Sequence, residues 1–140
     1  MKDKNFINSA LSVIEIESKA VMNLRNQIQS DFESLCSNIL QIEGKLILMG
    51  IGKSGHIAQK ISATLSSTGT SSFFIHPTEA AHGDLGMINK KDAILLLSNS
   101  GETKEIIEIL PALKRSTANI FTLTNNYQST IAKAGKINLV

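Results

Sequence analysis

The hydrophobic residues at the start of the chain recur with the spacing of a helix. Apolar side chains from Phe6 to Ile28 return every three or four positions, which predicts one long amphipathic helix over this stretch. The same spacing resumes after Ser30-Asp31, where a second helix is expected to begin. The chain is therefore expected to open with two helices.

Farther along, short apolar runs alternate with stretches of helical spacing. The runs predict five strands, at 45–49, 71–75, 93–97, 119–123 and 136–140. Helices are expected between them, at about 54–67, at 105–114 and briefly after 123. Pro111 should kink or end the helix at 105–114. Apolar strands separated by helices are typical of an α/β fold, and we predict a doubly wound, five-stranded parallel sheet.

Composition narrows the class of protein. The 140 residues suit one domain, and a net charge of +2 with 4% aromatic residues argues against nucleic acid as a partner. Cys36 is the only cysteine, which excludes an internal disulfide and fits a reducing compartment. The N-terminus lacks the apolar core of a signal peptide, and no apolar run approaches the roughly 20 residues of a membrane span. A cytoplasmic protein without a membrane partner is expected.

The turn after the first predicted strand half-matches two phosphate-binding motifs. Its sequence, GIGKSG (50–55), contains G-x-G-x-x-G and also the end of a P-loop. The P-loop interpretation fails because Ile47 stands where its first glycine is required. The dinucleotide interpretation is disfavoured because the nearest acidic residue, Glu79, lies beyond the end of the second predicted strand. What remains is a glycine-rich turn that either binds an anion at a helix N-terminus or binds nothing.

A second polar stretch, SNSGET, follows the third predicted strand. Asn99 and Glu102 have the spacing of a capping box, so one interpretation is simply a well-capped helix. A cap does not require three hydroxyls, however, and Ser98, Ser100 and Thr103 beside free helix N–H groups suit a single phosphate monoester. Carboxyl ends of parallel strands share one edge of a sheet. Two such turns therefore predict a sugar phosphate as ligand.

These stretches carry a resemblance to a known family. The segments GIGKSGHIAQKISATLSSTGTSSFFIHPTEAAHGDLGMI and LLLSNSGETKEI resemble the sugar isomerase (SIS) domain and, more narrowly, bacterial arabinose-5-phosphate isomerases. SNSGE alone marks the broad class, whereas its combination with GKSGH and HPTEAAHGDLG is more specific. The resemblance implies a flavodoxin-like fold and a homotetramer formed through the N-terminal helices. It also implies interconversion of D-ribulose 5-phosphate and D-arabinose 5-phosphate for synthesis of Kdo, a sugar of lipopolysaccharide and some capsules.

The resemblance also implies site residues. The phosphate is expected to be held by Ser54, Ser98, Asn99, Ser100 and Thr103. Lys53 and Glu105 are expected to act at the reacting end of the sugar, and His82 on a hydroxyl or on ring opening. Without the resemblance, Lys53 is also consistent with a solvent-exposed lysine in a turn. Glu105 is likewise consistent with an acidic residue that the helix dipole favours in the first turn of a helix. No cofactor and no metal are expected, although a zinc site is the alternative for the histidines and acids of 76–84.

The position at which the sequence ends bears on the predicted isomerase activity. In the family, the chain continues beyond the position of Val140 with a glutamate-bearing loop, a closing helix and an HPGG-like stretch that supplies a catalytic histidine. A pair of CBS domains often follows. Residues 1–140 are therefore expected to form an SIS domain truncated at its C-terminal end, without CBS domains. Two other classes stay open, a non-catalytic SIS module that binds a sugar phosphate and an isomerase of another sugar phosphate.

Overall fold

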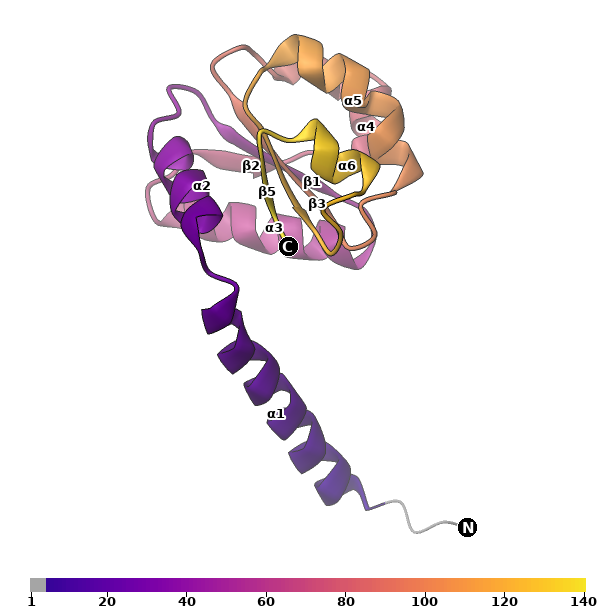
Figure 1. Cartoon of the computed structure of the whole chain (residues 1–140). Coiled ribbons are helices and arrows are strands. Elements are labelled where there is room, and N and C mark those ends of the chain that lie inside the picture. The colour runs from indigo at the N-terminus through magenta and orange to yellow at the C-terminus, as the bar shows by residue number, and fades with distance from the viewer. Residues whose placement is uncertain (1–4) are drawn as a thin grey trace. The chain divides into compact units, whose positions relative to one another are not determined.

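The computed structural model describes residues 5–140, which divide into an N-terminal unit ending at Ser30 and a second unit from Asp31 to Val140 (Figure 1). The N-terminal unit contains α1 (Phe6–Asn23), whose first turn is capped by the Asn5 side chain, and a short 3-10 turn, η1 (Leu24–Asn26). The helix predicted to run to Ile28 therefore ends earlier. Its last turn tightens into 3-10 form, as helix ends commonly do.

The second unit alternates helices and strands. Its elements in chain order are α2 (Ser30–Leu40), β1 (Leu46–Gly50), α3 (Lys53–Ser67), β2 (Ser72–Phe74), α4 (Pro77–Ala81), η2 (Asp84–Met87), β3 (Ala93–Ser98), α5 (Lys104–Ser116), β4 (Ile120–Thr124), α6 (Thr130–Ala134) and β5 (Ile137–Leu139). All five predicted strands are present. No helix in the described part of the chain is both long and apolar enough to cross a membrane.

The five strands form one parallel sheet in the order β2-β1-β3-β4-β5, which confirms the predicted fold class. The central strands are buried on both faces because helices cover each side, and this is why they appear in the sequence as continuous apolar runs. Figure 1 shows α2 and α3 on one side of the sheet and α4, α5 and α6 on the other. The core on the first side includes Leu46, Leu48, Leu95 and Leu97, and the core on the second side includes Ile47, Met49, Ile94 and Leu96.

This topology determines where a crevice opens. From β1 the chain crosses to β2 on one side, and it later enters β3 on the other side of β1. The helices that follow β1 and β3, α3 and α5, consequently lie on opposite faces of the sheet. Ligands of doubly wound sheets bind at such a switch point, beyond the carboxyl ends of the strands.

The structure corrects two local predictions. Helix α5 continues through Pro111 to Ser116. Pro111 is exposed, whereas Ile109, Leu110 and Leu113 are buried in the core, so tertiary packing outweighs the cost of about 3 kcal/mol for proline inside a helix. The segment around 76–87, where no helix was predicted, forms α4 and η2. Pro77 at the first helical position favours the start of α4.

Candidate active site

The glycines of the turn between β1 and α3 have different roles. Gly52 has a φ of +56°, which a residue with a side chain rarely adopts. Gly50 and Gly55 instead allow the helix to approach the strand, because a Cβ on Gly55 would lie 2.8 Å from the carbonyl oxygen of Gly50. The motif thus brings the N-terminus of α3 directly against the end of β1.

The N-terminus of α3 has no side-chain cap. The first amide of the helix that donates along the chain is Gly55 N, to the carbonyl of Ile51 at 3.3 Å. Within residues 5–140, the N–H groups of Lys53 and Ser54 have no acceptor, and the half-buried Ser54 hydroxyl forms no hydrogen bond. These groups are free to bind an anion, and the positive end of the helix dipole favours one.

Internal hydrogen bonds fix the loop 98–103, which follows β3. Ser98 Oγ accepts a hydrogen bond from Gly101 N at 3.0 Å and shares another with Thr103 Oγ1 at 2.7 Å. Ser100 Oγ accepts from Glu102 N at 3.1 Å. Ser98 is only 3% exposed, whereas Ser100 is exposed and Thr103 is half-buried. Ser98 therefore closes the loop from inside, and the other two hydroxyls lie nearer its surface.

The structure rules out the capping-box interpretation of Asn99 and Glu102. Thr103 is the N-cap residue of α5, and its side chain makes no capping bond because it is engaged with Ser98. Glu102 instead accepts a hydrogen bond from Thr130 N at 2.7 Å, at the start of α6. This backbone hydrogen bond lowers the pKa of Glu102 below its ordinary value.

The N-terminus of α5 is consequently open as well. Its first bonded amide is Ile106 N, which donates to the carbonyl of Thr103 at 3.1 Å. The amides of Lys104 and Glu105 have no acceptor in the described part of the chain. Both helix starts lie at one edge of the sheet, since Gly50 of β1 pairs in register with Leu97 of β3. Two uncapped N-termini on opposite faces thus lie at the carboxyl edge of these strands, at the switch point where doubly wound sheets have their binding crevice.

Residues that follow β4, up to the start of α6, hold the 98–103 loop in place. Gly101 has a φ of +68° and is buried against Ser129, whose side chain occupies the space that a Cβ would need. The carbonyl of Gly101 accepts from Ile131 N at 3.0 Å, and that of Asn99 accepts from Asn125 N at 2.9 Å. Sequence analysis missed these contacts, because they join residues far apart in the chain.

The proposed chemical groups follow three different strands and do not form a preassembled cluster. Lys53 and Glu105 are exposed residues in the first turns of α3 and α5, and neither makes an ion pair within residues 5–140. His82 is exposed at the C-terminal end of α4, and no hydrogen bond joins it to loop 98–103 in the described chain. His76 caps α4 by accepting from Thr78 N. No group of three or more potential metal ligands occurs among the described residues.

Comparison with known proteins points to one family. The model of the SIS domain matches residues 39–140. The arabinose 5-phosphate isomerase KdsD of Pseudomonas aeruginosa is 49% identical over 96% of this chain and 41% of its own length. The arabinose 5-phosphate isomerase KpsF of Escherichia coli CFT073 is 48% identical over 94% of this chain and 40% of its own. The chain thus spans about two fifths of these curated relatives.

A solved structure gives the same result for the fold. An Escherichia coli CFT073 protein in complex with arabinose 5-phosphate superposes with a TM-score of 0.92. It is 41% identical, and the match covers 99% of this chain and 74% of that one. The order of strands and helices described above is therefore shared with a protein that binds arabinose 5-phosphate.

Proposed function

The chain belongs to the SIS domain family, and on that premise we propose that it provides the substrate-phosphate site of an arabinose 5-phosphate isomerase. The reaction is the interconversion of D-ribulose 5-phosphate and D-arabinose 5-phosphate. One observation carries the proposal: two uncapped helix N-termini lie at the same edge of the sheet, after neighbouring strands, and hydroxyl groups accompany each of them. The names of the two curated relatives and the solved complex with arabinose 5-phosphate support it.

The phosphate is held, in this proposal, by groups from both turns. Ser54 and the first amides of α3 approach it from one side, and Ser100, Thr103 and the first amides of α5 from the other. Either hydroxyl of the Ser98–Thr103 pair can be the donor, and with Ser98 donating, the Thr103 hydroxyl is free to donate to the phosphate. Asn99 is exposed beside Ser100 and adds a side-chain donor.

The chemistry is assigned to exposed side chains beside this phosphate site. Aldose–ketose isomerisation moves a proton between C1 and C2 through an enediol, so it needs a base and a group that stabilises charge on the oxygens. We assign the charge-stabilising role to the Lys53 ammonium and proton transfer to the Glu105 carboxylate. His82 is assigned to a substrate hydroxyl or to opening of the sugar ring. The reaction assigned to these groups requires no cofactor.

The wider setting is also proposed. The product would supply Kdo synthesis for lipopolysaccharide or capsule, a process of the cytoplasm. Residues 5–23 contain an amphipathic helix, α1, with no buried residue, whose apolar side chains include Ile7, Leu11 and Ile14. We infer that α1 joins copies of the chain into a homotetramer, which buries this apolar stripe.

The test measures the turnover of D-ribulose 5-phosphate by the wild type and two variants, with NMR detection of the D-arabinose 5-phosphate that forms. Ser100→Ala is expected to reduce turnover at limiting substrate by about tenfold or more. Ser116→Ala, at the opposite end of α5, is the matched control and should behave as wild type. Saturable binding of the sugar phosphate without any turnover would instead favour a non-catalytic binding module.

A further inference from the structure

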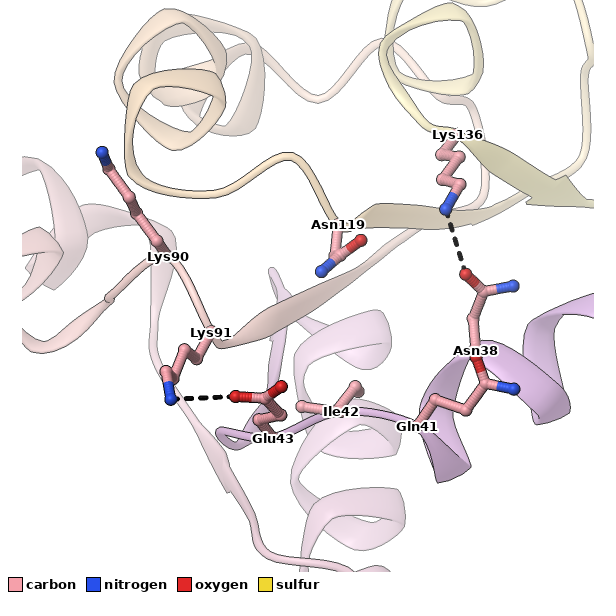
Figure 2. Close-up of a pocket in the computed structure, with 8 residues that line it drawn as sticks. All are labelled: Asn38, Gln41, Ile42, Glu43, Lys90, Lys91, Asn119 and Lys136. Carbon is pink, nitrogen blue, oxygen red and sulfur yellow. Dashed lines mark hydrogen bonds and ion pairs between the residues drawn. The ribbon is translucent and has the colours of Figure 1, made fainter.

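A polar pocket lies at the edge of the sheet opposite the crevice. Its volume is about 370 Å³, and it lies among the C-terminal end of α2 and the segments that lead into β3, β4 and β5 (Figure 2). The residues that follow the strands form the crevice, whereas residues that precede the strands form this pocket. The two sites are therefore separated by the length of the central strands, about 15–20 Å for strands of five or six residues.

Positive charge predominates in the pocket. Three lysines, Lys90, Lys91 and Lys136, line it against one acid, Glu43. Lys91 pairs with Glu43 at 2.8 Å, and Lys136 donates to the side-chain oxygen of Asn38 at 3.1 Å. Lys90 forms no ion pair with any described residue. An anion would therefore meet two ammonium groups that no acid of the described chain neutralises.

The remaining lining groups are donors and acceptors without partners. The side-chain amides of Gln41 and the half-buried Asn119 form no hydrogen bond within residues 5–140. Each offers two N–H donors and one carbonyl acceptor. Ile42 is the one apolar side chain among the lining residues, and no aromatic ring is present for a base to stack on. Such a lining suits hydroxyls and anionic groups better than a nucleobase or an apolar ligand.

The pocket has charged groups at two ends. Figure 2 shows the Lys136 ammonium facing Asn38 on one side. The Lys91–Glu43 pair lies on the other side, with Asn119 between the two. The volume falls within the range of about 300–1,000 Å³ that is typical of small-molecule sites, and it exceeds what one phosphate ion needs. Because Glu43 neutralises Lys91, the free positive charge on that second side is the one on Lys90. A ligand with one negative group near Lys136, another near Lys90 and a polar middle fits this arrangement.

A buried network holds the pocket rigidly. The fully buried Asp92 carboxylate accepts from Lys45 N at 2.9 Å and from Asn89 N at 2.8 Å. The carbonyl of Lys91 accepts from Gly44 N at 3.1 Å, which ties the turn before β3 to the loop before β1. Lys90 and Lys91 therefore project from a backbone that is fixed before any ligand arrives, which lowers the entropic cost of binding.

We propose that this pocket is a second ligand site, which binds a small polyhydroxylated molecule with two or more negative charges, such as a sugar bisphosphate or a phosphorylated sugar acid. The inference does not depend on the function assigned to the crevice, because the two sites share no residue. Inorganic pyrophosphate is a suitable probe, since it carries two linked anionic groups in a compact molecule.

The experiment is a titration of the ¹⁵N-labelled chain with pyrophosphate in the presence of saturating D-arabinose 5-phosphate. Saturable amide shifts are expected at 41–43, 90–91, 119 and 136, and not at 98–105. The double variant Lys90→Gln/Lys136→Gln should weaken this binding by about tenfold or more. The control Lys60→Gln/Lys114→Gln removes the same charge from exposed positions outside the pocket and should leave affinity unchanged.

Three results would overturn the proposal. The first is the absence of saturable shifts at the pocket residues in the folded wild type. The second is an equal loss of affinity in both double variants, which would mean that pyrophosphate binding depends only on the net charge of the chain. The third is a response of these residues to an RNA oligonucleotide but not to pyrophosphate. Failure of the crevice assignment would appear separately, as a lack of shifts at 98–105 when D-arabinose 5-phosphate is added.

Discussion

At the scale of single residues, two serines of one loop differ in what they do. Ser98 is buried and accepts the amide of Gly101, whereas Ser100 is exposed. Loss of the Ser98 hydroxyl removes two hydrogen bonds inside the loop, with Gly101 N and with Thr103, and leaves Gly101 N only the Ser98 carbonyl at 3.2 Å. Loss of the Ser100 hydroxyl removes a donor that a ligand can reach. The two positions therefore separate the stability of the loop from its affinity for phosphate.

Ser100→Ala is expected to weaken binding of D-arabinose 5-phosphate about tenfold or more, since a hydrogen bond to a charged group contributes about 1.5–3 kcal/mol. Its unfolding free energy should stay close to that of the wild type. Ser98→Ala should lower the unfolding free energy by about 1–3 kcal/mol. Calorimetric titration and urea denaturation measure the two effects. Equal destabilisation by both substitutions would contradict the separation.

Lys53 and Glu105 are predicted to act on the reacting end of the sugar and not on its phosphate. Positioned acid–base groups contribute typically 10²–10⁴-fold to rate. Lys53→Ala and Glu105→Gln should each reduce kcat about a hundredfold or more, while changing substrate affinity less than Ser100→Ala does. The measurement is kcat and Kd in the form of the protein that turns over ribulose 5-phosphate. Near-normal turnover of Glu105→Gln would contradict a role in proton transfer and would mean that Glu105 only interacts with the dipole of its helix.

At the scale of elements, the carboxylate of Glu102 links two helices. It lies beside the start of α5 and accepts the first amide of α6. The same region is secured by Gly101, which packs against Ser129. The hydroxyls of the 98–103 loop were identifiable from sequence because they are adjacent. Their division of roles was not, since it depends on which hydroxyl the folded loop buries, and contacts with residues 28 positions away hold that loop in place.

This link predicts a pH dependence of stability. The hydrogen bond from Thr130 holds the pKa of Glu102 in the folded protein below its ordinary value of 4.5. A lowered pKa in the folded state means that the carboxylate stabilises the fold above pH 4.5, and that this contribution disappears as the pH falls below 4.5.

Glu102→Gln should therefore reduce stability near neutral pH and show a shallower loss of stability below pH 4.5 than the wild type. Urea denaturation between pH 3 and 7 measures both effects. Glu17→Gln, an exposed position in α1, is the control and should follow the wild-type profile. Identical profiles for Glu102→Gln and the wild type would show that the Glu102–Thr130 bond does not contribute to stability.

At the scale of the whole molecule, the alternation of apolar strands with helices was sufficient to predict a doubly wound parallel sheet. The buried runs at β1 and β3 are apolar on both faces, so their pattern is unambiguous in the sequence. Helix α4 was missed because its five residues are too few to show a period. The passage of α5 through Pro111 was missed because tertiary burial, which local sequence does not reveal, outweighs a local penalty. The polar pocket at the amino edge was missed because its lysines come from separate turns.

The central claim is that the N-termini of α3 and α5 bind one phosphate together. Residue-resolved NMR titration of the ¹⁵N-labelled chain with D-arabinose 5-phosphate tests it most directly. The account predicts that the amide signals of Lys53, Ser54, Lys104 and Glu105 all shift with a single dissociation constant. D-arabinose without phosphate should leave these signals unchanged, and NAD and ATP should also leave them unchanged. Shifts confined to one of the two turns, or produced by NAD and not by the sugar phosphate, would contradict it.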